Sequence, residues 1–330
     1  MQDTLLITGG AGFIGSKLVL TLVKGGQRVV TLDALTYAGN RANLAPLDGD
    51  PNHTFVHGSI NDFALVAELL KRHQPRAILH LAAESHVDRS IEAPAAFIET
   101  NVVGTHTLLR AALGYWQALP AASQARFRFL HVSTDEVYGS LAPGEESTES
   151  SPYLPNSPYA ASKAASDHLA RAYHHTYGLP VLMTHASNNY GPYQFPEKLI
   201  PLLILRAVKG EPMPVYGDGL NERDWLHVSD HVAALTRVLE AGVPGETYNV
   251  GAGNSISNLT VVEALCAGLD ALVPAGAPHA RLRTFVTDRL GHDRRYALAV
   301  AKIRRELGWQ PKVQFAEGIR QTVAWYVKQF

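Results

Sequence analysis

Residues 5–15 read Leu5-Leu6-Ile7-Thr8-Gly9-Gly10-Ala11-Gly12-Phe13-Ile14-Gly15. The first four residues are typical of a buried strand, and the amphipathic stretch over 15–24 is typical of a helix. Glycines at such a junction permit a tight turn and let a pyrophosphate approach the backbone at the helix N-terminus. Because this is the first strand-to-helix junction of the chain, it predicts a dinucleotide-binding site rather than an ordinary turn with a helix cap.

An acidic residue follows at the position that such a site requires. Asp33 ends the second predicted strand, about 20 residues beyond the glycines, where a carboxylate binds the ribose hydroxyls of the dinucleotide. A carboxylate there repels a 2′-phosphate, so NAD is favoured over NADP. Arg41 argues weakly the other way, because a nearby cation tolerates that phosphate.

Strand and helix patterns alternate through the first two thirds of the chain. Strands are predicted at 5–8, 28–32, 54–57, 77–81, 127–133 and 181–186. Helical patterns between them include 15–24, 63–72 and 94–113. This alternation predicts an α/β fold of the Rossmann type, with a doubly wound parallel sheet.

Proline and glycine become frequent after residue 187, which indicates a change of architecture. We expect 1–187 to form the NAD-binding domain, which carries the catalytic residues. We expect 188–330 to form a smaller C-terminal α/β lobe for the substrate, with some chain crossing back to the sheet and a last helix over 318–330.

Composition excludes several classes of protein. The 330 residues contain 29 basic and 30 acidic side chains, a formal net charge of −1, so we expect no nucleic acid or membrane partner. The first predicted strand begins near residue 5, and no run approaches the roughly 18 apolar residues of a membrane span. We therefore expect a cytoplasmic protein without a signal peptide. The histidines show no metal-ligand spacing, and the single Cys266 reads as a packing residue.

Tyr159 and Lys163 are spaced by four residues at the start of a predicted helix, so they share one helix face. A free tyrosine has a pKa near 10, and a neighbouring ammonium lowers that pKa. The pair therefore predicts a general base that accepts a proton from an alcohol as hydride leaves.

Three polar residues, Thr134, Asp135 and Glu136, follow the predicted strand 127–133. Ligands of open parallel sheets bind at the carboxyl ends of the strands. Two adjacent carboxyl groups repel each other when ionised, so one of them tends to keep its proton. The result is an acid beside a base, which elimination of water needs. A solvent-exposed acidic turn is the alternative.

These motifs and three longer blocks, 80–90, 187–201 and 288–296, resemble the dTDP-glucose 4,6-dehydratases, a family of extended short-chain dehydrogenases/reductases. The resemblance covers essentially the whole chain. It implies a hydro-lyase that converts dTDP-glucose to dTDP-4-keto-6-deoxy-glucose and water with a retained NAD. It also implies that the C-terminal lobe binds the nucleotide sugar.

The resemblance assigns a role to each catalytic residue. Tyr159 removes the proton of the C4 hydroxyl, which Thr134 helps to hold, while NAD takes the C4 hydride. Glu136 then removes the C5 proton, and Asp135 protonates the departing C6 hydroxyl. The hydride returns to C6, and Lys163 supports Tyr159. No metal is implied.

The same resemblance implies two sets of binding residues and a homodimer that pairs through 94–113 and 159–177. The expected NAD contacts are Gly9, Gly12, Phe13, Ile14, Gly15, Asp33, Ser59, Ile60, Ala82, Ala83, Tyr159 and Lys163. The expected substrate contacts are Ser85, His86, Asn188, Glu197, Lys198, Leu199, Pro214, Tyr216, Arg223, Asn258, Arg289 and Tyr296. The chain departs from the family pattern at Ser59, where relatives usually have aspartate, and at Leu290, where they usually have proline.

Three other functions remain open at this stage. A nucleotide-sugar 4-epimerase would share the glycine turn, Tyr159 and Lys163 but has no need of Asp135 and Glu136. A UDP-glucose 4,6-dehydratase differs only in the base, and one methyl group is worth about 1–3 kcal/mol. A non-catalytic NAD sensor ranks last, because it would not need the Tyr159–Lys163 pair.

Overall fold

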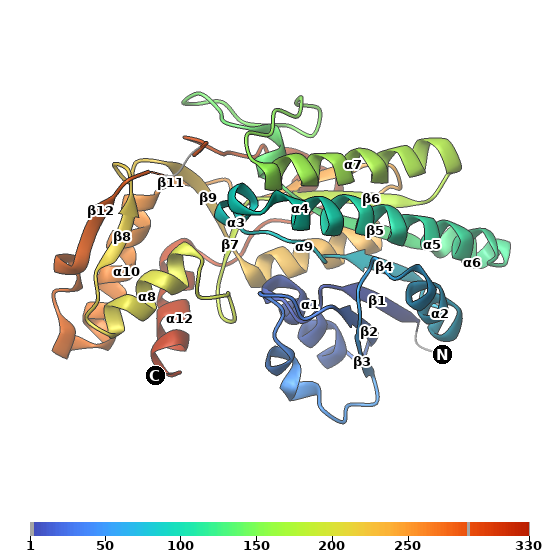
Figure 1. Cartoon of the computed structure of the whole chain (residues 1–330), viewed down its shortest axis with the longest axis horizontal. Helices are drawn as coiled ribbons and strands as arrows, with labels where there is room; N and C mark the ends of the chain where they lie inside the picture. The colour runs from blue at the N-terminus through green and yellow to red at the C-terminus, as the bar shows by residue number, and fades with distance from the viewer. Residues whose placement is uncertain (1–2, 289–290, 330) are drawn as a thin grey trace.

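The computed structural model describes residues 3–288 and 291–329 (Figure 1). Its centre is a seven-stranded sheet in the order β10-β6-β5-β4-β1-β2-β3, with every neighbouring pair parallel. The strands are β1 (Thr4–Thr8), β2 (Arg28–Asp33), β3 (His53–His57), β4 (Ala77–His80), β5 (Arg128–Thr134), β6 (Val181–Ala186) and β10 (Thr247–Val250). The predicted α/β fold is confirmed, and six of these strands match the predicted ranges within one residue.

Helices cover both faces of this sheet, so its strands are apolar almost throughout. One face packs against α1 (Phe13–Lys24), α9 (Val228–Ala241) and α11 (Ala301–Leu307). The other packs against α2 (Phe63–His73), α5 (Thr105–Gln117) and α7 (Pro158–Tyr177). Figure 1 shows α5 and α7 lying side by side, and the two helices are in contact.

The single helix predicted over 94–113 is interrupted. It consists of α4 (Pro94–Phe97), a π-helical turn η2 (Ile98–Gly104) and then α5. Gly104 packs closely here, since a Cβ on it would lie 2.4 Å from Asn61 Oδ1. Within the turn, Asn101 is buried and donates a hydrogen bond of 2.9 Å to Ser162 on α7. π-Helical turns are rare, and they occur frequently at functional sites.

The second lobe has its own core. Its sheets are β11-β9-β7 and β12-β8, built from β7 (Asn188–Tyr190), β8 (Met213–Tyr216), β9 (Glu222–His227), β11 (Ser255–Ser257) and β12 (Arg283–Val286). Its helices are α8 (Leu199–Val208), α10 (Asn258–Leu272) and α12 (Phe315–Val327). Helix α12 begins three residues before the predicted range, after the N-cap residue Gln314.

Chain from the second half also returns to the first sheet. Strand β10 is an edge strand beside β6, and α9 packs on α1, although both lie beyond residue 187. The exact domain division stays a prediction. None of the described helices is long and apolar enough to cross a membrane.

Candidate active site

A cavity of about 350 Å³ lies at the carboxyl ends of the parallel strands. All of the predicted NAD contacts line it, as do Thr134, Asp135 and Glu136. Four predicted substrate contacts also line it: Ser85, Asn188, Glu197 and Lys198. The fold therefore brings the expected cofactor and catalytic residues together in one space.

The other predicted substrate contacts do not line this cavity. They are His86, Leu199, Pro214, Tyr216, Arg223, Asn258 and Tyr296. Arg289 and Leu290 lie outside the described residues. The role of all these residues in binding stays a prediction.

Several of these residues have specific partners elsewhere. His86 Nε2 lies 3.8 Å from Glu197 Oε1 at the edge of the cavity. The Arg223 guanidinium lies 4.4 Å from the centroid of the Tyr296 ring and donates a 2.8 Å hydrogen bond to the Asp293 carbonyl. Arg223 is also buried, and its positive charge opposes the rise in the pKa of Asp135.

The glycine turn fits its predicted purpose in two different ways. Gly9 has a φ of +71°, and a Cβ on Gly15 would lie 2.1 Å from the Gly9 carbonyl oxygen, so both positions need glycine for the fold itself. A Cβ on Gly12 would meet only that oxygen, at 3.4 Å. Gly12 also precedes the first turn of α1, which has no side-chain cap, so its amides face the cavity for an anion.

This difference predicts opposite results for two alanine substitutions. We expect Gly15→Ala to lower the free energy of unfolding by about 1–3 kcal/mol, because the new methyl overlaps backbone. We expect Gly12→Ala to keep wild-type stability but to retain less NAD, because the methyl occupies the path of the pyrophosphate. Urea unfolding and the amount of NAD released on denaturation measure the two effects. Gly114→Ala, with nothing within 4 Å of the new Cβ, is the control. Equal NAD content in Gly12→Ala and wild type would contradict the assignment.

Asp33 lines the cavity at the end of β2. Its two carboxylate oxygens accept hydrogen bonds of 2.8 Å from the backbone amides of Ala11 and Leu35. Arg41, the residue that argued for NADP, pairs with Asp48 at 2.7 Å and lies over the Phe55 ring. An Asp33 carboxylate, with the nearby Arg41 paired to Asp48, fits NAD.

The departure at Ser59 leaves a shorter polar group at this end of the cavity. Ser59 Oγ accepts a 3.1 Å hydrogen bond from the Asn61 amide and lines the cavity with Ile60. The hydroxyl orders the loop before α2 without adding a charge.

Strand β5 ends in a short 3₁₀ turn, η3 (Asp135–Tyr138), that presents the two carboxyl groups. Thr134 Oγ1 accepts a 3.3 Å hydrogen bond from the Glu136 amide and donates one of 3.2 Å to Asp135 Oδ1. Asp135 is buried, and its Oδ2 has no hydrogen-bond partner among the described residues. Burial, and then the neighbouring Glu136, raise the pKa of Asp135 well above its ordinary value. A carboxyl group with a raised pKa at this position can donate a proton.

This raised pKa predicts a pH dependence of stability. Folding favours the protonated form of Asp135, so its contribution is fully present below the ordinary aspartate pKa and is lost as pH rises through the raised pKa. We expect Asp135→Asn to lose less unfolding free energy than wild type between these two pH values. Urea unfolding across that range measures the difference, and parallel curves for the two proteins would contradict it.

Tyr159 and Lys163 share one face of α7, as predicted. The Tyr159 ring packs edge-on against Phe97, and Lys163 Nζ donates a 3.0 Å hydrogen bond to the Val132 carbonyl. Burial and then Glu136 raise the pKa of Tyr159 well above 10, while a hydrogen bond with Thr134 opposes them. The surrounding side chains alone therefore do not make Tyr159 a phenolate, and a base at this position needs additional positive charge from the ligands.

Several cavity residues were not singled out from the sequence. They are Tyr37, Glu84, Asn189, Gln194, Phe195 and His231. Four of them lie inside the family-like blocks 80–90 and 187–201, which could have indicated them. Tyr37 and His231 lie outside these blocks, and no motif in the sequence indicates them. Arg89 stacks on the Tyr37 ring at 4.2 Å, and His231 Nδ1 lies 3.0 Å from Asn189 Oδ1.

A dinucleotide cradle that leads directly to a Tyr–Lys pair is the arrangement of the extended short-chain dehydrogenases/reductases, and this chain has that fold and that arrangement. Within this class, the chain belongs to the family described as GDP-mannose 4,6 dehydratase, whose model matches residues 6–322.

Individual proteins of known function or structure are also similar to this chain. The chain is 61% identical over 326 residues to a dTDP-glucose 4,6-dehydratase of Xanthomonas campestris pv. campestris, covering 98% of this chain and 93% of the relative. A dTDP-glucose 4,6-dehydratase from Streptomyces venezuelae, solved with NAD and a second ligand bound, superposes with a TM-score of 0.90 at 50% identity, covering 98% and 97% of the two chains. A UDP-glucose 4-epimerase from Thermotoga maritima superposes with a TM-score of 0.87 at 29% identity, covering 99% of each chain. The predicted family resemblance is confirmed.

Proposed function

We propose that this chain is an NAD-dependent dTDP-glucose 4,6-dehydratase, a hydro-lyase that forms dTDP-4-keto-6-deoxy-glucose and water. The observation that carries the proposal is the pair Asp135 and Glu136, which line the same cavity as Tyr159. Oxidation at C4 alone, as in an epimerase, needs only the tyrosine. An acid and a base beside it fit the removal of water from C5 and C6.

The cofactor is NAD, and the chain offers a fitting cradle for it. The uncapped start of α1 and the open space over Gly12 suit the pyrophosphate, and Asp33 suits the adenosine ribose. Tyr159 and Lys163 line the same cavity and would hold the nicotinamide end. When bound, NAD supplies a hydride acceptor and donor together with a positive nicotinamide ring.

The side chains of the protein move the protons. Thr134 orients the C4 hydroxyl, and Tyr159 accepts its proton. The resulting ketone acidifies the C5 hydrogen, which Glu136 removes. Asp135, kept protonated by burial, donates its proton to the departing C6 oxygen, so one water leaves. Glu136 then returns a proton to C5 as C6 is reduced. The proton that Tyr159 accepted passes to Asp135 through solvent, so all three side chains regain their starting forms.

The test uses the purified protein, dTDP-glucose and no added cofactor, with the product measured by mass spectrometry. Loss of one water without net formation of NADH is the expected result. Appearance of dTDP-galactose at unchanged mass would identify an epimerase instead. If only UDP-glucose lost water, the uridine-specific dehydratase would replace the proposal. No reaction with either sugar would favour the sensor.

We also propose a homodimer that pairs through α5, α7 and the π-turn before α5. Large apolar side chains are exposed on these elements, with Ile98 at 48%, Val103 at 41% and Tyr177 at 50%. A second copy of the chain would cover this surface as a four-helix interface. Light scattering at twice the 35.8 kDa chain mass is expected, and a monomer would contradict it. A cytoplasmic location stays a prediction from the sequence.

A further inference from the structure

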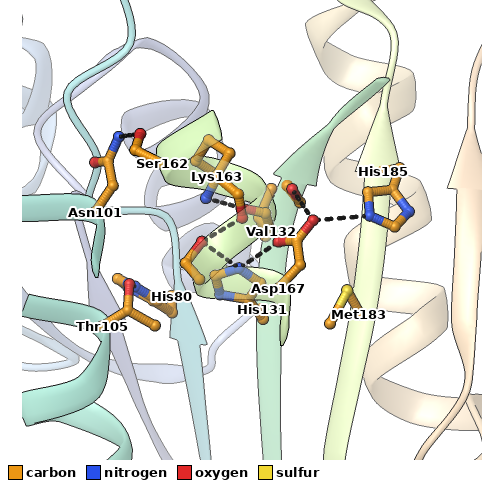
Figure 2. A network of polar contacts seen from close by, with 12 residues as sticks. His80, Asn101, Thr105, His131, Val132, Ser162, Lys163, Asp167, Met183 and His185 are labelled. Atoms are coloured by element: carbon orange, nitrogen blue, oxygen red, sulfur yellow. Dashed lines mark hydrogen bonds and ion pairs between the residues drawn. The ribbon is translucent and has the colours of Figure 1, made fainter. Parts of the chain in front are cut away.

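Helix α7 carries a third buried functional group beyond Tyr159 and Lys163. Asp167 follows Lys163 by four residues, so the three side chains occupy one helix face. This face is turned toward β5 and β6, and Figure 2 shows Asp167 between their side chains. None of the proposed chemical steps uses Asp167, and it does not line the cavity.

Asp167 is almost completely enclosed, with 1% of its surface exposed. Its Oδ1 lies 2.9 Å from His131 Nε2, and its Oδ2 lies 3.0 Å from His185 Nε2. Ser133 Oγ donates a further hydrogen bond of 2.8 Å to Oδ2. A carboxylate that accepts three hydrogen bonds in this way is held in the ionised form.

The contacts of Asp167 and Lys163 bind α7 to one short piece of β5. Asp167 contacts the side chains of His131 and Ser133, while Lys163 Nζ donates to the carbonyl of Val132 between them (Figure 2). The next residue of the strand is Thr134. The position of the catalytic turn relative to α7 is therefore set by these two charged side chains together.

The pKa shifts of His131, Asp167 and Lys163 indicate which of these buried groups carry charge. Burial and then Lys163 lower the pKa of His131 to about 4, so this imidazole is neutral at neutral pH. Burial raises the pKa of Asp167, but hydrogen bonds from His131 and His185 outweigh it and hold the pKa well below the usual range. Burial also lowers the pKa of Lys163, and Asp167 opposes that shift. Asp167, one helical turn beyond Lys163 on α7, is thus the acidic group whose charge opposes the effect of burial on Lys163.

We propose that Asp167 is a positioning residue of the active site: its buried carboxylate keeps Lys163 in the charged form and fixes the end of β5 that presents Thr134. Lys163 lies one helical turn beyond Tyr159 and lines the same cavity, so its charge adds to the positive charge that a bound ligand supplies there. Asp167 therefore acts on the reaction through Lys163 and touches neither substrate nor cofactor.

Other titratable groups surround this pair, and the test must distinguish their effects. Those facing Lys163 and Asp167 are His80 on β4, His131 on β5, His185 on β6, Tyr138 on η3 and Tyr153 in the following loop. Glu136 and Asp135 act on Tyr159 at the other end of the same helix face. None of these groups opposes the effect of burial, which lowers the pKa of Lys163, whereas Asp167 does.

The decisive variant is Asp167→Asn, which keeps the shape and removes the charge. We expect the NMR titration midpoint of the Lys163 side chain to fall by about one pH unit or more. The basic limb of the kcat profile with dTDP-glucose should move down with it. Asp167→Glu keeps the charge and should stay near the wild-type midpoint. A wild-type midpoint in Asp167→Asn would overturn the proposal, since a purely structural role predicts lower stability without a shifted titration.

If Asp167→Asn does not fold, a second pair of variants tests whether the charge of Asp167 sets the Lys163 midpoint. His131→Gln and His185→Gln each remove one partner of Asp167 but leave its charge, so the Lys163 midpoint should stay near that of wild type. A shift in either variant as large as the one expected for Asp167→Asn would contradict a charge effect. The proposal rests on the proposed oxidation at C4, but the NMR titration needs no turnover. An inactive wild type would therefore refute the function and leave the role of Asp167 open to measurement.

Discussion

Glu136→Gln should stop the reaction halfway, with the bound cofactor reduced and a 4-keto sugar held on the protein. Glutamine keeps the shape of the side chain at the end of β5 but cannot accept the C5 proton. Tyr159 and Thr134 remain in place, so the first oxidation proceeds. General-base catalysis contributes about 10²–10⁴-fold, and we expect overall turnover to fall by that factor. The absorbance of reduced cofactor after mixing with dTDP-glucose measures the accumulation.

The matched control for this variant is Asp135→Asn, one residue away in the same turn. It removes the proton donor and leaves the C5 base, so exchange of the C5 hydrogen with deuterated solvent should continue while water loss slows. Glu136→Gln should show neither exchange nor water loss. Normal turnover of Glu136→Gln would show that the base is another residue.

Tyr159→Phe should block the reaction before any cofactor is reduced. The substitution removes only the hydroxyl oxygen, and the edge-on contact of the ring with Phe97 can persist. Without an acceptor for the C4 hydroxyl proton, hydride transfer would leave a protonated ketone, which is strongly unfavourable. We expect a loss of roughly 10³-fold or more in kcat, with no reduced cofactor in a single turnover.

Tyr153→Phe supplies the comparison, because Tyr153 is also a partly buried tyrosine and bonds His185 Nε2 at 2.8 Å. It does not line the cavity, so this variant should keep most of the activity. If Tyr159→Phe reduced its cofactor at the wild-type rate, Tyr159 would not be the first base.

Much of the fold could be predicted because its signals are local. Six strands of the main sheet are marked by short, mainly apolar segments of sequence, and their predicted ranges agree with the structure within one residue. The seventh strand, β10, lies at residues 247–250 in the second half of the chain. No local feature of the sequence there indicates that it joins the sheet of the first domain. The π-turn at 98–104 was missed for a related reason: the pattern over 94–113 is helical throughout, and the close approach of Gly104 to Asn61 within the turn is a tertiary contact.

The same distinction applies to the site. The sequence alone determined the glycine turn, the spacing of Tyr159 and Lys163 and the acidic turn after β5, because each is a relation between residues a few positions apart. Only the tertiary structure decided that burial raises the pKa of Asp135 and that Asp167 lies between His131 and His185. Protonation depends on burial and on charges brought from distant segments, and Asp167 meets those histidines across 36 and 18 residues of chain. The spacing of residues in the sequence shows neither the burial of Asp135 nor the contacts of Asp167 with the two histidines. Both follow from the way the elements pack, including α7 on the sheet.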